Sequence, residues 1–168
     1  MNTIGSVKGD LNIEKRISIT IETVKKFSSL GFSINIEKNY AKHLGIGDEE
    51  YQRAGAILNN TKKEVFEKSD IILNVNCPLA DDIDLIKNKS ILISQFDISN
   101  DKDIINKLIK KNIKVFSLNL LPRITRAQSM DVLSSQANLA GYKAVIDSFA
   151  NFEKAIPMMM TAAGTIPP

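Results

Sequence analysis

The chain has 168 residues, of which 43% are hydrophobic and 24% are charged, and these fractions are ordinary for a globular domain. Its 22 basic and 19 acidic residues give a net charge of only +3, and the basic residues are dispersed rather than gathered with aromatic residues. Nucleic-acid binding is therefore not expected, because a phosphate-binding surface needs concentrated positive charge.

Cysteine and histidine are scarce in this chain. The single cysteine, Cys77, excludes an internal disulfide and fits a reducing compartment, so we expect a cytoplasmic protein. The single histidine, His43, lies in a polar stretch and is expected to be a surface-loop residue. One cysteine and one histidine cannot supply the usual zinc ligand set, and no metal site is expected. No segment approaches the roughly 20 apolar residues that span a bilayer, so direct membrane insertion is not expected.

Helix and strand patterns alternate along the chain. The first helix is expected from Thr20, which can cap its start, to Leu30, with Gly31 providing a left-handed stop. Short runs rich in β-branched residues predict strands, and runs with acidic starts or basic ends predict further helices. The strands are expected at residues 32–36, 71–75, 91–94 and 113–118, and the helices at 48–54, 61–68 and 101–111.

This alternation predicts an α/β fold of flavodoxin-like or Rossmann-like type, with a largely parallel sheet and helices on both faces. In such sheets, ligands bind beyond the carboxyl ends of the strands. The segment that begins at Pro122 follows the last expected strand directly, so it falls where a ligand is expected.

The last part of the chain has a different character. A long helix is expected over residues 129–151, and one of its faces carries mostly uncharged polar residues where a helix that only covers a core would show Lys and Glu. Residues 155–168 carry no charge and include three consecutive methionines, which makes a poor solvated tail. We therefore expect an α/β domain at 1–128, a helix at 129–151 that crosses toward a further domain, and a connector at 152–168.

The candidate site lies around the start of this long helix. Arg123 precedes Gln128, Asp131 and Ser134, which follow one another at three-residue spacing, so a loop donor could face an amide, a carboxylate and a hydroxyl. The alternative is a capping cluster, in which Ser129 or Asp131 satisfies free N–H groups and an arginine pairs with Asp131. Spacing alone leaves both interpretations open.

A family resemblance bears on this choice. The stretch PRITRAQSMDVLSSQANLAGYKAV, residues 122–145, resembles the signature of the alpha subunit of proton-translocating NAD(P) transhydrogenase. Further similarity at residues 14–16, 20–26, 51–56 and 157–168 extends it over nearly the whole chain. The resemblance implies the N-terminal domain of the alanine dehydrogenase/transhydrogenase family, lacking the glycine-rich NAD-binding domain that would follow.

The resemblance also implies roles for the candidate residues. Arg123, Gln128, Asp131 and Ser134 would bind the nicotinamide end of NAD(H), and the first three would take part in hydride transfer from NADH to NADP⁺. Asp131 would orient Arg123, and Gln128 could reach the second nucleotide. Arg16 matches a family arginine near the cleft.

The implied assembly is larger than this chain. The partners would be the rest of the alpha subunit, membrane components and a component that carries NADP(H), together with a second copy in a homodimer. These partners would hold the protein at the inner membrane while its own residues stay in the cytoplasm. The 168-residue piece alone would be inactive.

Two other functions remain open from the sequence. An alanine dehydrogenase typically carries a lysine at a strand end and a catalytic histidine in regions that read LNVNCP at 73–78 and SQFDI at 94–98 in this chain. Neither residue is present, although oxidation of an amino acid needs an acid/base and a cation for the carboxylate. These departures favour transhydrogenase. The third possibility is a non-catalytic subunit-interaction module.

Overall fold

The computed structural model describes residues 2–96, 102–154 and 156–167, and the chain divides into two compact units, Met1–Leu121 and Pro122–Pro168. The first unit contains a six-stranded sheet, and the second contains a long helix and a two-stranded sheet. The boundaries expected at residues 128 and 151 stay a prediction.

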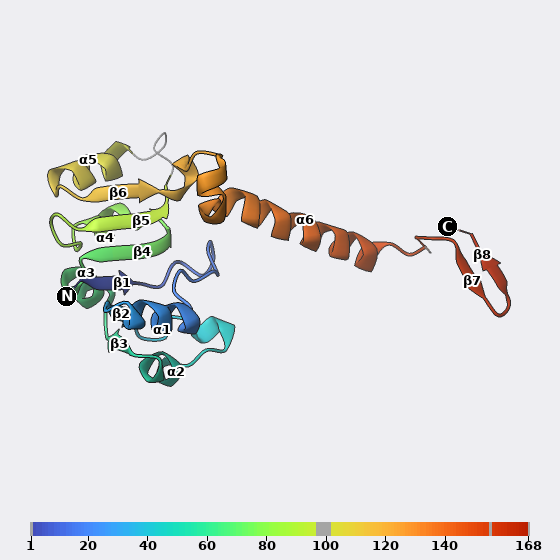
Figure 1. The fold of residues 1–168 in the computed structure, drawn as a ribbon, viewed down its shortest axis with the longest axis horizontal. Helices are drawn as coiled ribbons and strands as arrows, with labels where there is room; N and C mark the ends of the chain where they lie inside the picture. The colour runs from blue at the N-terminus through green and yellow to red at the C-terminus, as the bar shows by residue number, and fades with distance from the viewer. Residues whose placement is uncertain (1, 97–101, 155, 168) are drawn as a thin grey trace. The chain divides into compact units, whose positions relative to one another are not determined.

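The sheet of the first unit is parallel throughout, in the strand order β3-β2-β1-β4-β5-β6 (Figure 1). The chain builds outward from β1 to β3, returns to pair β4 with the other side of β1, and then builds outward to β6. This is the order of doubly wound dinucleotide-binding folds, whose topological switch point lies between the first and fourth strands. The strands are β1 Thr3–Ser6, β2 Ser33–Glu37, β3 Ala56–Asn59, β4 Ile71–Asn76, β5 Ile91–Gln95 and β6 Lys114–Ser117.

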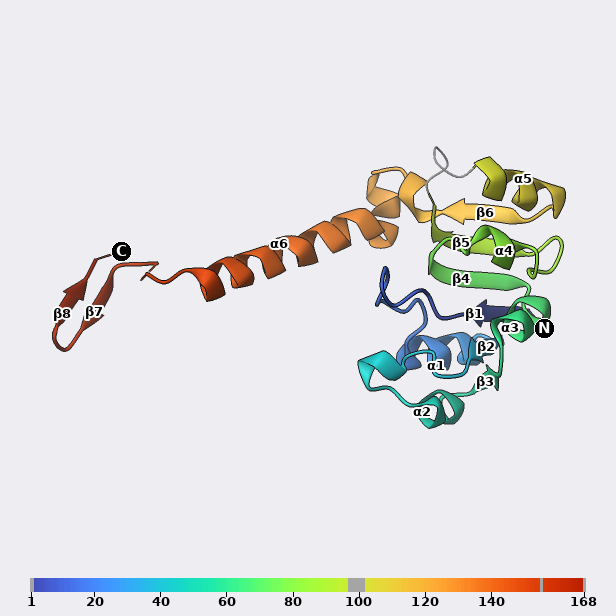
Figure 2. The same ribbon diagram turned by 180° about the vertical axis from the view of Figure 1, so that it is seen from behind.

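Helices pack on both faces of this sheet, as Figure 2 shows from behind. One core contains Val24 of the first helix and Tyr51 of the second, and the other contains Phe66 of the third and Leu108 of the fifth. Alternate residues of a strand point to opposite faces, so Ile72 of β4 enters the second core. The helices are α1 Ile21–Ser29, α2 Asp48–Arg53, α3 Lys62–Lys68, α4 Ala80–Ile83 and α5 Lys102–Lys110, with the 3₁₀ turns η1 Lys42–Leu44 and η2 Leu118–Leu120.

The fold class predicted from the sequence is confirmed, and so are most of its elements. Thr20 caps α1 by accepting a hydrogen bond from the Thr23 N–H at 3.2 Å, and Gly31 has a φ of +86°. Thr61 caps α3 in the same way, accepting from the Glu64 N–H at 3.3 Å. The expected helix at 101–111 corresponds to α5, although Asp101 lies outside the described residues.

Two strands of the first unit were not predicted from the sequence. β1 reads TIGS and β3 reads AILN, and each has only four residues, which is too short for a clear alternating pattern. The run Asp81-Asp82-Ile83-Asp84 belongs to the one-turn helix α4 and its C-cap. Because β1 lies in the middle of the sheet, missing it also meant missing the strand order.

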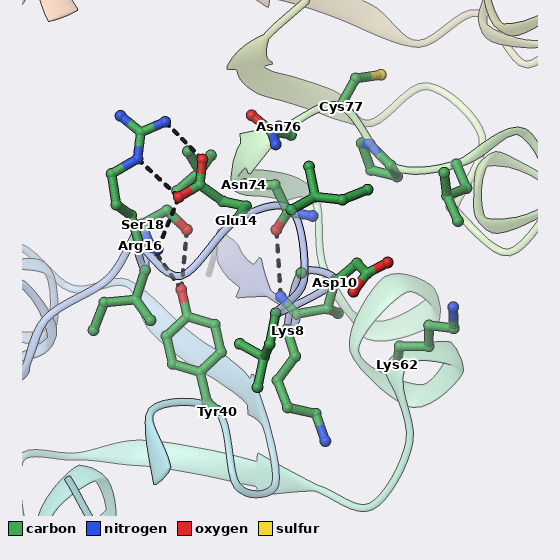
Figure 3. A pocket seen from close by; sticks show the side chains of 18 of the residues that line it. Lys8, Asp10, Glu14, Arg16, Ser18, Tyr40, Lys62, Asn74, Asn76 and Cys77 are labelled. Atoms are coloured by element: carbon green, nitrogen blue, oxygen red, sulfur yellow. Dashed lines mark hydrogen bonds and ion pairs between the residues drawn. The ribbon is translucent and has the colours of Figure 1, made fainter. Parts of the chain in front are cut away.

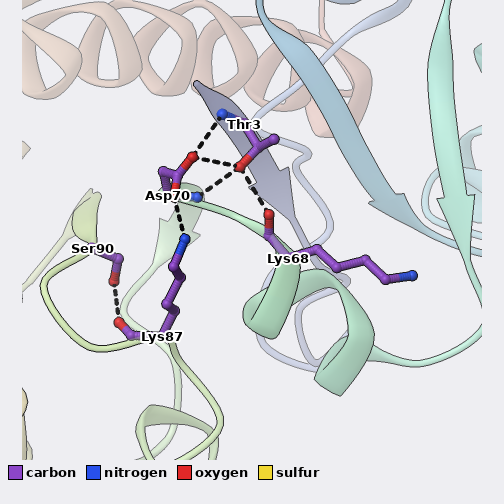
Figure 4. A network of polar contacts seen from close by, with 5 residues as sticks. All are labelled: Thr3, Lys68, Asp70, Lys87 and Ser90. Carbon is purple, nitrogen blue, oxygen red and sulfur yellow. Dashed lines mark hydrogen bonds and ion pairs between the residues drawn. The ribbon is translucent and has the colours of Figure 1, made fainter. Parts of the chain in front are cut away.

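A polar network fixes β1 against β4 at the end of the sheet where both strands begin (Figure 4). Asp70, which precedes β4, accepts hydrogen bonds from the Thr3 backbone N–H at 3.2 Å and from the Thr3 hydroxyl at 2.9 Å. Lys87 donates to its other oxygen at 2.6 Å. The network therefore sets the register of the two strands that form the switch point.

The second unit begins with the 3₁₀ helix η3, Thr125–Met130, and continues with α6, Val132–Asn151. The long helix thus starts later than its expected position at 129, because Ser129 belongs to η3 and Asp131 is the N-cap. The uncharged tail contains a hairpin that the sequence analysis did not predict, formed by β7 Met159–Thr161 and β8 Gly164–Ile166. Gly164 has a φ of +124° at its turn, a conformation that favours glycine.

Candidate functional site

A cavity of about 300 Å³ opens at the carboxyl ends of β1 and β4 (Figure 3). It lies at the topological switch point, where parallel α/β sheets bind their ligands, because the chain leaves the two strands there in opposite directions. Its wall contains residues from 7–18 after β1, Tyr40 and His43 after β2, Lys62 of α3, and residues 74–82 from β4 into α4.

Tyr40 makes one wall of the cavity rigid. Its hydroxyl accepts hydrogen bonds from the Ser18 N–H at 3.0 Å and the Ile19 N–H at 3.2 Å, and it lies 2.7 Å from the Ser6 hydroxyl. The side chain is only 2% exposed and packs edge-on against Tyr51, with 5.7 Å between ring centroids. These bonds fix the start of α1 beside the end of β1 before any ligand enters.

Asn74 of β4 joins the two strands at the switch point. Its side-chain oxygen accepts from the Val7 N–H at 3.3 Å and from the Ser6 hydroxyl at 3.4 Å. Asn76 and Cys77 follow at the end of β4, and the Cys77 N–H donates to the Gln95 carbonyl at the end of β5. The strand ends therefore place amide groups in the cavity wall, and Cys77, which also lines it, packs against the second core.

The basic side chains of the cavity wall occur in ion pairs. Arg16 and Glu14 form a two-pronged pair, with Nε 2.8 Å from one carboxylate oxygen and Nη2 2.6 Å from the other. Lys62 lies 2.6 Å from Asp82. The hydrogen bond from Arg16 lowers the pKa of Glu14, and the same contact raises the pKa of Arg16, so both groups stay charged across the ordinary pH range.

His43 lies beside the cavity, whereas the sequence predicted only a surface-loop residue. It belongs to η1 and is exposed, but it lines the cavity, and its Nε2 lies 2.7 Å from the Lys15 carbonyl oxygen. A carbonyl only accepts, so Nε2 carries the hydrogen and is not available to take a proton from a ligand. The contact therefore has a structural role.

The residues expected to bind a ligand from the sequence all belong to the second unit. Arg123 lies before η3 and Gln128 within it, and both are exposed. Asp131 is the N-cap of α6, and its carboxylate accepts from the Ser134 N–H at 2.9 Å and from the Ser134 hydroxyl at 2.6 Å. The capping role considered from the sequence is thus present for Asp131, whereas Ser129 does not cap α6.

The expected contact between Asp131 and Arg123 is not among the ion pairs of the described residues. Ser134 occupies the carboxylate instead, and its hydrogen bonds lower the pKa of Asp131, with a smaller contribution from the positive charge of Arg123. Asp131 is therefore ionised near neutral pH and oriented by the first turn of the helix. Arg123 and Gln128 make none of the described side-chain hydrogen bonds, which leaves their donors available to a ligand.

Most of this chain matches one protein-family model. Residues 7–140 match the family model described as alanine dehydrogenase/PNT, N-terminal domain, and this match includes the whole cavity wall and residues 122–140. The chain belongs to the alanine dehydrogenase/PNT N-terminal domain family. The resemblance predicted from residues 122–145 is confirmed.

Several relatives of this N-terminal domain family are similar over most of the chain. The first part of NAD(P) transhydrogenase subunit alpha from Rhodospirillum rubrum is 40% identical over 160 residues, covering 92% of this chain and 42% of the relative. A crystal structure of transhydrogenase from Sinorhizobium meliloti superposes with a TM-score of 0.88 at 41% identity, covering 99% of this chain and 49% of that one. Alanine dehydrogenase of Methanococcus maripaludis is 31% identical over 138 residues, covering 82% of this chain and 36% of the relative. The chain thus spans less than half the length of each.

Most of the cavity residues, Tyr40 and Asn74 among them, were not predicted from the sequence. The signal that could have found them is the short run TIGS followed by Glu14 and Arg16, which marks a first strand with a polar loop behind it. Arg16, which was placed near the cleft only by resemblance, does line the cavity. No described group of three His, Cys, Asp or Glu residues could hold a metal ion, and no described helix has both the length and the apolar character needed to cross a bilayer.

Proposed function

We propose that this chain is the N-terminal part of the NAD(H)-binding component of a proton-translocating NAD(P) transhydrogenase, which transfers hydride from NADH to NADP⁺. The observation that carries the proposal is the 40% identity to the Rhodospirillum rubrum transhydrogenase alpha subunit over 160 residues. The remainder of that component would supply the site for the pyrophosphate, since this sequence contains no glycine-rich phosphate-binding motif.

The ends of β4 and β5 support hydride transfer between nucleotides over amino-acid oxidation. β4 ends in Asn76 and is followed by Cys77, and β5 ends in Gln95 and is followed by Phe96, which is 5% exposed. None of these groups is a lysine or histidine that could move a substrate proton at neutral pH. Hydride transfer from one nicotinamide to another needs no such group, only the two rings held at about 3–3.5 Å in a site without water.

The proposed nicotinamide-binding groups are Arg123, Gln128, Asp131 and Ser134. Bound NAD(H) supplies a hydride at the nicotinamide C4 atom. The carboxamide of that ring both donates and accepts hydrogen bonds, and the guanidinium, amide, hydroxyl and carboxylate of the four residues offer both kinds of partner. The Ser134 hydroxyl donates to Asp131, so its oxygen is left to accept from an amide N–H.

In this proposal each side chain has its own task. Arg123 places a fixed positive charge beside a ring that gains or loses charge during transfer, and the ionised Asp131 balances it from the helix start. Gln128 orients the second nucleotide, which is bound by the NADP(H)-binding partner. Positioning of this kind affects the transfer step more than binding, because it counts only when both rings are in place.

The proposed partners follow from the same assignment. They are the remainder of the alpha subunit, membrane and NADP(H)-binding components, and a second copy of the chain. This assembly would stand in the cytoplasm at the inner membrane. The apolar surface of α6, which has no buried residue, supports association with further protein surface. Sedimentation of the full-length protein tests the dimer, and a monomer at micromolar concentration would contradict it.

The decisive experiment uses the full-length protein with its partner components. We expect Gln128→Ala to lower hydride transfer from NADH to NADP⁺ roughly tenfold while the NADH dissociation constant stays within about threefold. Gln52→Ala, on the exposed surface of α2, is the matched control and should change neither. Unchanged transfer by the Gln128 variant would remove this residue from the mechanism.

The 168-residue chain alone gives a second test. We expect no catalysis and negligible NADH affinity, because binding of the nicotinamide end leaves most of the dinucleotide unsupported. A low-micromolar dissociation constant measured by calorimetry would contradict the division of the NAD(H) site between this chain and a further domain.

An alanine-dehydrogenase-like oxidoreductase is the second candidate, favoured by the 31% identity to the Methanococcus maripaludis enzyme and by Arg16 in the cavity. Pyruvate- and ammonia-dependent oxidation of NADH by the full-length protein would establish it. A non-catalytic interaction module would show subunit association without any response to either nucleotide.

A further inference from the structure

Lysines from two separate segments of the chain come together at the amino ends of β5 and β6. Residues 84–91 and 107–114 contain six lysines and one acidic residue, Asp84, and so carry a net charge of +5. The whole chain carries only +3, which makes the remainder slightly acidic. The excess positive charge of the protein is therefore concentrated in these two segments, which we call the lysine edge.

Backbone hydrogen bonds hold the two segments side by side. The Lys89 N–H donates to the Lys111 carbonyl at 3.0 Å, and the Lys114 N–H donates to the Ser90 carbonyl at 2.9 Å. β5 and β6 are parallel and begin at the same edge of the sheet, opposite the carboxyl ends at which the cavity opens (Figure 1). The lysine edge is therefore one surface, at the far end of the sheet from the cavity.

Three of the six lysines have partners within the first unit. Lys107 lies 2.6 Å from Asp84, and Lys87 lies 2.6 Å from Asp70. Lys111 donates to carbonyl groups at the end of α4. The other three lysines are exposed and occur in none of the ion pairs or side-chain hydrogen bonds of the described residues, so their charge is available to a partner. They are Lys89, Lys110 and Lys114.

The backbone at Lys89 gives a second indication that the edge has a partner. Its φ is +63°, in the left-handed region that glycine and asparagine adopt readily and other residues rarely. The lysine side chain is exposed and forms none of the hydrogen bonds within the described structure that would compensate for this conformation. Folding of the first unit therefore does not explain a lysine at this position, whereas an interaction outside the unit does.

We propose that the lysine edge binds the anionic surface of a phospholipid bilayer without inserting into it. The inference rests on the proposed function, which puts this chain beside membrane components, and adds a direct contact with lipid headgroups. Contact at this edge turns the cavity away from the bilayer, because the two lie at opposite ends of the sheet. The lysine edge thus orients the first unit on the membrane.

The composition of the edge favours a bilayer over a protein partner. All six cations are lysines, and lysine is depleted at protein–protein interfaces, where arginine is preferred for its planar, two-pronged contacts. A lysine ammonium is a strongly hydrated point charge, which suits a diffuse anionic surface. Each lysine near such a surface strengthens binding roughly fivefold, so the three available lysines give about a hundredfold.

The test is co-sedimentation of the full-length protein with vesicles of equal parts phosphatidylglycerol and phosphatidylcholine. We expect binding that is absent with phosphatidylcholine alone and is weakened by about 0.5 M sodium chloride, because salt screens surface charge. The variant that combines Lys89→Asn, Lys110→Gln and Lys114→Gln should bind at least tenfold more weakly. Asparagine is chosen at position 89 because it tolerates the left-handed conformation.

The matched control removes three exposed lysines elsewhere in the first unit. Lys25→Gln, Lys38→Gln and Lys42→Gln change the net charge by the same amount, and these lysines occur in none of the ion pairs of the described residues. Binding of this control to the anionic vesicles should stay within about threefold of the wild type. Equal losses in the two triple variants, or unchanged binding of the edge variant, would overturn the proposal.

Proteoliposomes that contain the membrane and NADP(H)-binding components distinguish lipid from a protein partner. With phosphatidylglycerol present, the edge variant should need at least a fivefold higher concentration than the wild type for half-maximal hydride transfer, at an unchanged maximal rate. With phosphatidylcholine alone, the two proteins should not differ. An equal shift in both lipids would indicate a protein partner, and tighter binding of the wild type to duplex DNA than to vesicles would indicate nucleic acid. Either result would overturn the bilayer contact.

Failure of this contact and failure of the proposed function give different results. If hydride passes from NADH to NADP⁺ in the assembled protein but vesicle binding does not depend on the lysine edge, only the bilayer contact is rejected. If no such transfer occurs, the transhydrogenase assignment fails, while the vesicle measurement, which uses no nucleotide, still decides the contact.

Discussion

The two units of this chain obtain their order in different ways. The first unit buries two hydrophobic cores on opposite faces of a parallel sheet, with Phe66 and Ile72 fully inaccessible. The second unit is built on α6, in which no residue is buried and large side chains such as Leu139 and Phe149 are 58% and 55% exposed. Its hydrogen bonds are mostly local.

Apolar residues therefore stabilise the first unit itself, whereas those of α6 are available for association with another surface. A sheet with two covered faces gains stability from burial inside the unit, whereas an apolar helix surface gains only when another surface covers it. The first unit should therefore respond to core substitutions as a cooperative domain does. Substitutions on α6 should affect association in the full-length protein more than the folding of the first unit.

The largest predicted effect tests this comparison directly. Phe66→Ala should lower the free energy of unfolding by about 3–5 kcal/mol, because it opens a cavity beneath α3. Phe149→Ala should lower it by less than about 1 kcal/mol, because its ring is half exposed. Urea unfolding followed by circular dichroism measures both, and similar losses for the two variants would contradict the comparison.

Gly5→Ala should lower the free energy of unfolding by about 2–3 kcal/mol through overpacking. A Cβ at Gly5 would lie 2.7 Å from Ser69 Cβ and 2.9 Å from Val65 Cγ1, where β1 and α3 pack closely. Gly9→Ala is the matched control, since its Cβ would find no neighbour nearer than 3.8 Å. Thermal unfolding of both variants is the measurement, and a tolerated alanine at Gly5 would show that α3 can shift away.

The acid dependence of stability should come in part from Asp70. Its hydrogen bonds from Lys87, and then from Thr3, hold the pKa of Asp70 below its ordinary value of 3.8 in the folded state. The resulting stability is fully present above the unfolded pKa and is lost as the pH falls through the lower, folded pKa. Because the pair with Lys87 is partly exposed, Asp70 should contribute about 1 kcal/mol or less to the free energy of unfolding.

Asp70→Asn keeps an acceptor for Thr3 but does not titrate. Unfolding free energies measured between about pH 6 and pH 2 should therefore fall less steeply for Asp70→Asn than for the wild type. Other carboxylates with lowered pKa, such as Glu14 and Asp84, titrate in both proteins and cancel in the difference. Identical acid slopes would show that Asp70 does not contribute.

The smallest expected effect is local to the second unit. Asp131→Ala removes the cap of α6, so the N–H of Ser134 loses its acceptor and the first turn should fray. Hydrogen exchange should accelerate at Ser134 while the amides of the first unit stay unchanged. Asp147→Ala, which breaks the pair with Lys143 near the other end of the helix, is the matched control. Faster exchange throughout the chain would indicate that the two units unfold together.

How well the sequence predicted the structure depended on the length of each element. α1 and α3 were found because Thr20 and Thr61 cap them and apolar residues follow at helical spacing. β3 was missed because its four residues follow α2 directly, with only Ala54 and Gly55 between, and Gly55 makes the break with a φ of +103°. The hairpin β7–β8 was missed because an uncharged run of methionines resembles a connector.

The sequence proposed only local candidates for the site. The series from Arg123 to Ser134 could be proposed from spacing and resemblance because it lies within one turn and the start of one helix, and its role stays a prediction. The cap formed by Asp131 is equally local, since Asp131 and Ser134 are three positions apart. The cavity could not be found this way, because Tyr40, Asn74 and Arg16 come from segments that only the sheet brings together.

The sequence by itself determined the class of the fold, most of the helices with their caps, and the family to which the chain belongs. These features depend on residue spacing within one element or on a continuous signature. Only the tertiary structure decided the strand order, the position of the switch point and the pairing of the basic side chains around its cavity. The reason is that parallel strands pair across long stretches of chain, so the neighbours of β1 are chosen by the packing of both cores and not by any local pattern.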